Sequence, residues 1–157
     1  MLELDIQWAT EELEVPSKPQ CYQWINSAMQ GDNKNSVNEL TVRFVEVEEI
    51  QQLNRDYRNM DKPTNVLSFP FEQPPGLIEL GEELPYLGDI VICPEIVLRE
   101  AAEQNKSEIA HWAHMMIHGA LHLQGFDHID DAEAEAMEAL EVQILEKLGF
   151  ANPYQES

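Results

Sequence analysis

Four short stretches of the chain have the length and the apolar pattern of β-strands. We predict strands over Leu2–Trp8, Asn38–Glu46, Asn65–Phe71 and Leu87–Cys93. The third stretch contains Pro70, and proline donates no hydrogen bond to a neighbouring strand. We therefore expect that strand to lie at an edge of the sheet.

Apolar residues spaced three and four apart predict the helices. The predicted helical segments are Gln20–Gln30, Val47–Arg58, Pro94–Glu103, Ala110–Gln124 with Ser107 as its cap, and Asp130–Leu148. Strands and helices together predict an α+β fold, α/β-like in its layers. We expect a mixed sheet of about four strands packed with about five helices, one of them central and buried.

The stretch Ala110–His128 stands apart in this pattern. It holds all five histidines of the chain, at positions 111, 114, 118, 122 and 128. From Ala110 to Gln124 it contains no Asp, Glu, Lys or Arg, and a helix that is apolar nearly all round is a buried helix. At about 100° per residue, the first four histidines fall within an arc of about 80°. A buried helix with a ridge of imidazoles indicates a metal site.

Three of the histidines have the spacing of ligands to one ion. His118 and His122 lie one turn apart on one helix face. Gly125 adopts the left-handed conformation at little cost, so we expect the helix to end there and His128 to return as a third ligand. Three neutral imidazoles and an open fourth position are typical of a catalytic zinc site, although imidazoles also suit nickel.

The other two histidines are less well placed for the ion. His111 is about 10 Å from His118 along the helix axis, so it is either a packing residue or an outer partner of the site. His114 is about 6 Å from His118 along the axis and is either an outer partner or a substrate contact.

The ligand spacing also matches the zinc peptidase pattern H-E-x-x-H-x-x-G-x-x-H. Gly119 occupies the position of the glutamate that deprotonates the zinc-bound water in those enzymes. Glycine has no side chain to act as a base. The sequence therefore argues against peptide hydrolysis by that mechanism, while the metal geometry is kept.

The charge of the chain bears on whether it can bind a nucleic acid. Its 30 acidic and 9 basic residues give a formal net charge of -21 at pH 7, which normally argues against a nucleic-acid binder. Four of the basic residues, Arg43, Arg55, Arg58 and Lys62, fall in one region. Screening over about 8 Å at physiological salt lets a positive cleft exist on a negative body. The acid excess serves either solubility or docking to a basic partner.

Length and composition predict one domain, residues 1–157. The start, MLELDIQWAT, has neither the basic residues nor the apolar core of a signal peptide, and no apolar run reaches membrane-spanning length. Cys21 and Cys93 have no CxxC spacing and are expected to be reduced thiols. These features predict a cytoplasmic protein without a membrane partner.

Three motifs together resemble those of a known family. NRDYRNMDKPTNVLSFPFE spans Asn54–Glu72, LGD occupies positions 87–89, and HGALHLQGFDH occupies positions 118–128. With these motifs the chain resembles, over nearly its whole length, the YbeY endoribonucleases, which are ribosomal RNA maturation factors. Asn65 stands where, by this resemblance, many relatives have Asp and some have Asn.

The resemblance implies a zinc-dependent, single-strand-specific endoribonuclease. Its substrate would be the 16S rRNA precursor, cleaved in 3′-end maturation and in ribosome quality control, and its partners the small ribosomal subunit and its proteins; no DNA is expected. The resemblance also implies roles for residues of this chain. His118, His122 and His128 would bind the zinc ion, Arg58 would be the essential cation near it, and His114 would be a further active-site residue.

The chemistry of RNA cleavage agrees with these roles. Negative charge builds on the phosphate oxygens during the reaction, and a guanidinium matches such a phosphate with two hydrogen bonds. We therefore expect Arg58 to bind the phosphate. The attacking group is either water or the RNA 2′-hydroxyl.

Several alternatives follow from the residues alone. Asp127 either orients a ligand imidazole or caps the next helix, and Asp89 is a candidate brace for the loop near the site. Ser68, Phe69 and Pro70 either line a substrate groove or, most of all for Phe69, belong to the sheet core. Other functions are a metallopeptidase or another metallohydrolase, or a non-catalytic ribosome-assembly factor.

Overall fold

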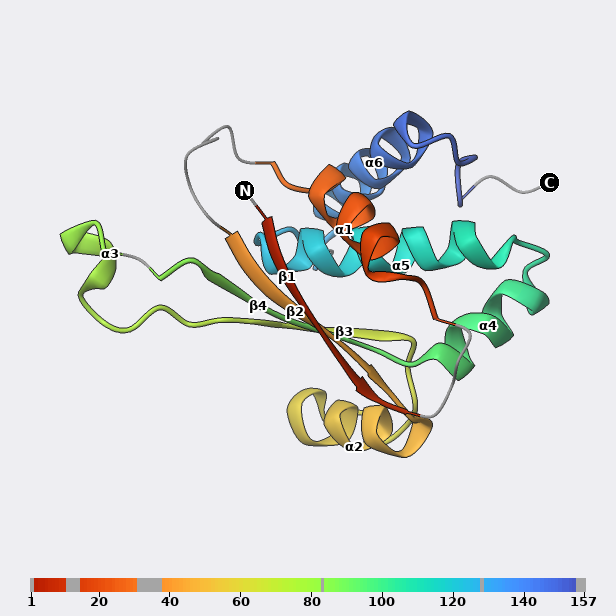
Figure 1. Ribbon diagram of the computed structural model, residues 1–157, viewed down its shortest axis with the longest axis horizontal. Helices are drawn as coiled ribbons and strands as arrows, with labels where there is room; N and C mark the ends of the chain where they lie inside the picture. The colour runs from red at the N-terminus through yellow and green to blue at the C-terminus, as the bar shows by residue number, and fades with distance from the viewer. Residues whose placement is uncertain (1, 11–14, 31–37, 83, 128, 155–157) are drawn as a thin grey trace.

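The computed structural model describes residues 2–10, 15–30, 38–82, 84–127 and 129–154 (Figure 1). The strands in these ranges are β1 (Leu2–Ala9), β2 (Asn38–Val45), β3 (Val66–Pro70) and β4 (Tyr86–Ile92). The helices are α1 (Lys18–Ser27), α2 (Val47–Arg58), α3 (Leu77–Leu80), α4 (Pro94–Glu103), α5 (Glu108–Leu123) and α6 (Asp131–Lys147).

The four strands form one mixed sheet in the order β1-β2-β4-β3. β2 is parallel to both β1 and β4, whereas β3 runs antiparallel to β4. Pro70 lies opposite Gly88 on β3, which is an edge strand. The predicted α+β fold with a mixed sheet is therefore confirmed, together with the edge position of the strand that contains Pro70.

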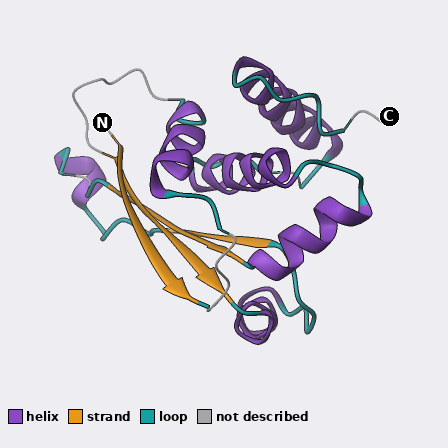
Figure 2. Ribbon diagram, turned by 45° about the vertical axis from the view of Figure 1, so that its right-hand side comes forward, coloured by secondary structure: helices purple, strands orange, loops and turns teal. Residues whose placement is uncertain are grey.

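The helices lie on both faces of the sheet (Figures 1 and 2). α1 and α5 cover one face, α6 lies beyond α5, and α2 lies against the opposite face. The larger apolar core joins the sheet to α1, α5 and α6. A smaller core, which includes Ile50 of α2 and Leu67 of β3, fills the other face.

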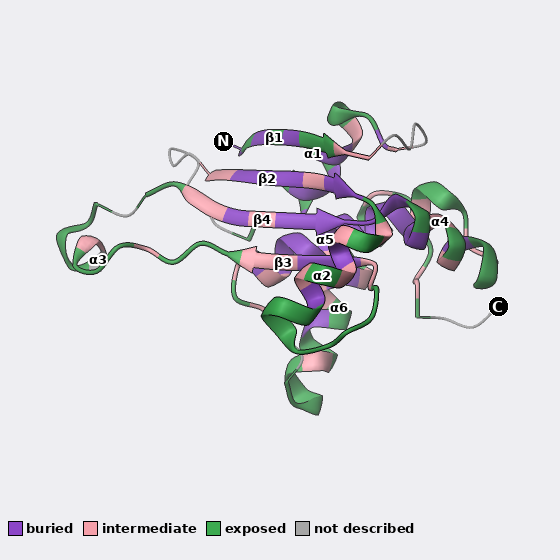
Figure 3. Ribbon diagram, turned by 90° about the horizontal axis from the view of Figure 1, so that it is seen from below, coloured by how far each residue is buried: buried purple, intermediate pink, exposed green. Residues whose placement is uncertain are grey.

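α5 is the central buried helix that the sequence predicts. Ser107 caps it by accepting a hydrogen bond from the backbone N–H of Ala110 at 3.0 Å. Trp112 packs edge-on against Phe44 of β2, with ring centroids 5.8 Å apart. Burial extends over most of α5, whereas α6 exposes its outer side (Figure 3). The ridge of histidines on α5 is therefore held in a fixed position relative to the sheet.

Two local predictions are wrong. Helix α1 begins at Lys18 because Ser17 and Gln20 form a reciprocal capping box and Pro19 fits in the first turn, where its missing N–H costs nothing. The segment Glu72–Pro85, which is acidic and contains prolines and glycines, predicts a loop, but Leu77–Leu80 within it form the one-turn helix α3. Among the described residues, no helix combines the length and the apolar character needed to cross a membrane.

Candidate active site

The two central histidines of α5 converge on one point. Nε2 of His118 and Nε2 of His122 are 3.0 Å apart, and the ring centroids are 4.5 Å apart. Two nitrogens bound to one zinc ion at about 2.0–2.1 Å and tetrahedral angles are separated by about 3.3 Å. The arrangement of this pair therefore fits two ligands of one metal ion.

The end of α5 has the conformation that the sequence predicts. The helix stops at Leu123, and Gly125 has φ +98, the left-handed region that favours glycine. The chain therefore turns out of the helix directly after the two converging imidazoles. His128, the predicted third ligand, lies outside the described residues. Within those residues, no group of three His, Cys, Asp or Glu side chains is arranged to hold a metal ion.

A buried carboxylate orients the ring of His118 through its Nδ1 atom, on the side of the ring opposite to His122. Oε1 of Glu141, on α6, is 2.5 Å from Nδ1 of His118, and Glu141 is fully buried. Burial would raise the pKa of Glu141, but the hydrogen bonds from His114 and His118 outweigh it and lower the pKa to about 2. An ionised carboxylate only accepts hydrogen bonds. His118 therefore carries its proton on Nδ1, which leaves the lone pair of Nε2 directed towards His122.

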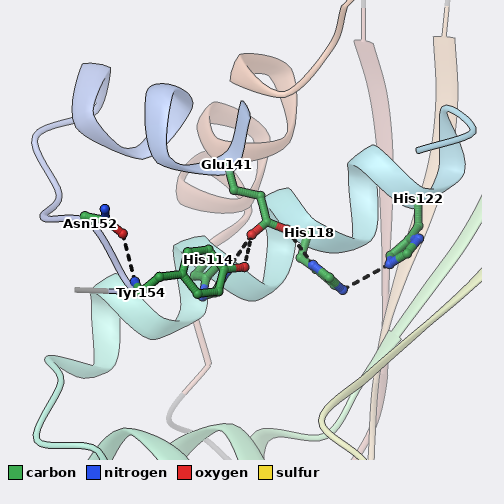
Figure 4. A network of polar contacts seen from close by, with 6 residues as sticks. All are labelled: His114, His118, His122, Glu141, Asn152 and Tyr154. Carbon is green, nitrogen blue, oxygen red and sulfur yellow. Dashed lines mark hydrogen bonds and ion pairs between the residues drawn. The ribbon is translucent and has the colours of Figure 1, made fainter. Parts of the chain in front are cut away.

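The same carboxylate binds two further groups (Figure 4). Oε2 of Glu141 is 2.9 Å from Nε2 of His114 and accepts a hydrogen bond from the hydroxyl of Tyr154. Burial and this contact with Glu141 raise the pKa of Tyr154, which keeps its hydroxyl protonated. The hydroxyl of Tyr154 also lies 3.0 Å from Nε2 of His114. The chain beyond α6 thus adds a side chain to the support of the histidine pair.

A cleft of about 530 Å³ opens beside the histidine pair. It is lined by Tyr57, Arg58, Val66, Leu67, Ser68, Phe69, Pro70, His118, His122, Gly125, Phe126 and Asp127. The predicted site residues Arg58, His118 and His122 therefore meet in one cleft, although they come from α2 and α5.

Arg58 is the last residue of α2 and is exposed. Arg43 forms an ion pair with Glu49 and Arg55 contacts Asp56, whereas no carboxylate in the described part of the chain lies within ion-pair distance of Arg58. Of the four clustered basic residues, only Arg58 lines the cleft. Among the described residues, the local positive cleft considered from the sequence therefore comes down to one guanidinium, that of Arg58.

The two outer histidines, His111 and His114, do not line this cleft but a separate cavity at the start of α5. His111 lies 3.0 Å from Oε1 of Glu100, which also accepts a hydrogen bond from the amide of Asn65 at 3.0 Å. Burial would raise the pKa of Glu100, but these hydrogen bonds outweigh it and lower the pKa. An aspartate at position 65 would place a second carboxylate against Glu100. The amide of Asn65 therefore suits this position, because it donates a hydrogen bond to the carboxylate of Glu100.

The remaining candidates have identifiable contacts. Ser68 lines the cleft and donates a hydrogen bond to the carbonyl of Gly119 at 3.0 Å. Asp127 also lines the cleft, while Asp130 supplies the N-cap of α6 by accepting from the backbone N–H of Glu133. Asp89 accepts a hydrogen bond from the hydroxyl of Tyr86. That hydroxyl is also 2.9 Å from Oγ1 of Thr41 on β2, so the side chain of Tyr86 links β4 to β2.

Glu141 and Tyr154 are the members of the site that the sequence analysis misses. The amphipathic pattern of the predicted helix Asp130–Leu148 places apolar residues inward and acids outward, and it therefore predicts an exposed Glu141. Glu141 nevertheless follows Met137 by four residues and precedes Ile144 by three, so it occupies the apolar stripe. An acidic residue within the apolar stripe of a helix is the sequence signal that could have identified Glu141. No comparable spacing marks Tyr154, which follows the helix.

Fold and cleft together define a class of α+β protein in which a buried, histidine-bearing helix opens onto a surface cleft beside an arginine. Comparison with known proteins specifies the family. The family model described as Endoribonuclease YbeY matches residues 5–149. The chain is 56% identical over 158 aligned residues to the Endoribonuclease YbeY of Hydrogenovibrio crunogenus, and the alignment covers 99% of each chain. The chain therefore belongs to the YbeY endoribonuclease family.

A solved structure supports the fold independently. The solution structure of TM1509 from Thermotoga maritima matches with a TM-score of 0.59 and 24% sequence identity, and the match covers 98% of this chain and 99% of the other. At this level of identity the likeness concerns the fold alone.

Proposed function

We propose that this protein is a cytoplasmic, zinc-dependent, single-strand-specific endoribonuclease that acts in 16S rRNA 3′-end maturation and in ribosome quality control. Family membership supports cleavage of RNA. The observation that carries the metal-dependent mechanism is the 3.0 Å approach of two imidazole nitrogens in a cleft that also contains Arg58, which has no ion-pair partner among the described residues. The proposed partners are the small ribosomal subunit and its proteins.

His118, His122 and His128 would hold the zinc ion. A zinc ion bound there supplies a Lewis acid that polarises a phosphoryl oxygen and lowers the pKa of a bound water. Glu141 keeps the proton of His118 on Nδ1 and so presents Nε2 as a donor atom.

Arg58 would bind the phosphate at the cleavage site. Its side chain is exposed in the cleft and has no carboxylate partner among the described residues, so it is available to a phosphate. Charge that builds on the phosphate oxygens is stabilised by charge-assisted hydrogen bonds. A cation at this place suits phosphodiester cleavage.

His114 would act through Glu141 and not on the substrate directly. Its Nε2 contacts Glu141 and Tyr154, and its side chain lines a different cavity, of about 740 Å³, at the start of α5. We therefore assign His114 a positioning role in which it holds the carboxylate that orients His118.

Peptide hydrolysis by the zinc peptidase mechanism has no support at position 119. A Cβ on Gly119 would lie 3.0 Å from Cγ2 of Ile90, so this position faces the sheet and has no room for a catalytic glutamate. The required base would have to come from elsewhere.

The test combines metal analysis with RNA cleavage. Arg58→Glu is expected to abolish cleavage of single-stranded RNA and leave the zinc content unchanged, whereas His118→Ala is expected to lose both. Arg55→Glu, an exposed change on the same helix, is the matched control and should retain both. Mature 16S rRNA 3′ ends in cells that carry only the Arg58→Glu or His118→Ala protein would contradict the proposal.

A further inference from the structure

The cleft beside the histidine pair contains aromatic rings as well as charge. Tyr57, Phe69 and Phe126 line it together with Arg58. Tyr57 is 69% exposed, although it is the neighbour in sequence of the proposed phosphate-binding residue. An exposed ring of this size inside a functional cleft calls for a ligand.

Phe69 holds the Tyr57 ring in place. The two ring centroids are 5.3 Å apart and the ring planes are inclined by 71°, which is an edge-to-face contact. Such a contact covers at most one face of the Tyr57 ring. The ring is thus positioned by β3 while most of its surface stays open to solvent.

Electrostatics alone is a poor source of RNA affinity in this protein. The chain has a net charge of -21. Arg58 is the only Lys or Arg among the described residues that line the cleft, which also contains Asp127. Each neutralised phosphate of a single strand contributes a slope of about -0.7 to the dependence of log affinity on log salt. A single cationic side chain predicts a weak salt dependence, so uncharged contacts must add to whatever affinity Arg58 and a bound metal ion supply.

We propose that Tyr57, supported by Phe69, is a stacking platform for an unpaired RNA base next to the phosphate bound by Arg58. This inference rests on the proposed function, because it takes single-stranded RNA as the ligand. A nucleotide joins a flat base to a phosphate through one sugar, and consecutive Tyr57 and Arg58 side chains offer the two matching surfaces. Bases in a duplex are already stacked and paired, so the platform favours single strands.

The test measures binding of a labelled, 2′-O-methylated oligoadenylate by fluorescence anisotropy, with its integrity checked on a gel. Tyr57→Ala is expected to weaken binding about 5- to 150-fold, the factor that corresponds to about 1–3 kcal/mol per stacked base. The salt slope should remain near -0.7. Tyr57→Phe should bind like wild type, whereas Tyr57→Leu, which keeps an apolar side chain without a π face, should bind like Tyr57→Ala.

Two controls separate stacking from other effects. Tyr22→Ala removes a tyrosine that is 38% exposed on α1, outside the cleft, and should leave binding unchanged. The same strand built from abasic nucleotides should bind wild type and Tyr57→Ala equally weakly. Binding of duplex RNA should not depend on position 57.

Failure of this inference differs from failure of the proposed function. A Tyr57→Ala protein that binds the base-bearing strand as tightly as wild type does would overturn the stacking platform. Equal affinity of the wild-type protein for the base-bearing strand and the abasic strand would also overturn it. A wild-type protein that binds the base-bearing strand through Tyr57 but cleaves no RNA keeps the platform and rejects the nuclease.

Discussion

Replacement of Glu141 by glutamine tests whether the buried carboxylate prepares His118 for a metal ion. The substitution keeps the volume of the side chain and removes its charge. In the native protein two carboxylate oxygens face three partners, the ring nitrogens of His114 and His118 and the hydroxyl of Tyr154. The new amide keeps only one accepting oxygen, so its NH₂ group must face at least one of these partners.

The structure sets the size of the effect. If the NH₂ group faces His118, the proton leaves Nδ1 and the donor atom for the metal is lost. If it faces His114 instead, that ring must carry its proton on Nδ1, which is buried without a hydrogen-bond partner. A buried unpaired N–H costs about 1–3 kcal/mol. Loss of such an outer partner typically weakens metal binding about 10- to 100-fold.

Competition with a coloured chelator measures the zinc affinity of the purified full-length protein. Glu141→Gln is expected to bind zinc about 10- to 100-fold more weakly than wild type. The matched control is Glu135→Gln, an exposed carboxylate on the same helix, which should bind like wild type. Wild-type zinc affinity in a folded Glu141→Gln protein would refute the reasoning.

Two other predictions concern stability. The pKa of Glu141 is lowered from 4.5 to about 2, so its ionised form contributes about 3 kcal/mol to the free energy of unfolding above pH 4.5. This contribution is lost as the pH falls from about 4.5 to about 2. The difference in unfolding free energy between wild type and Glu141→Gln, measured by urea titration with chelator present, should therefore shrink over that range. A difference that stays constant would contradict the account. Gly119→Glu should destabilise the protein by at least about 3 kcal/mol, because a charged side chain would be forced against Ile90 in the core. A Gly119→Glu protein with the wild-type urea midpoint would show that position 119 does not face the sheet.

Much of the fold is predictable because local patterns and packing agree. Helices α2 and α4 begin and end where the sequence predicts, at Val47 and Arg58 and at Pro94 and Glu103. The exit from α5 is also predictable, because the left-handed turn at Gly125 is a property of that residue itself. By contrast, the four residues of α3 are too few to show a helical period.

The site is predictable only in part, because its members come from distant elements. His118 and His122 share one helix face, so their spacing is enough to predict their approach. The place of Arg58 beside them depends on how α2 and β3 pack, which no local pattern reports. Glu141 is one of 30 acidic residues, and only its position in the apolar stripe of α6 separates it from the exposed ones.

The central claim is that the imidazoles of His118 and His122 bind one metal ion in the cleft beside Arg58. Titration of the chelator-treated protein with cobalt(II), followed by visible absorption, tests this claim most directly. The account predicts one ion per chain with a tetrahedral spectrum in wild type and in Arg58→Glu, and loss of that spectrum in both His118→Ala and His122→Ala. An unchanged cobalt spectrum in both histidine variants would contradict it.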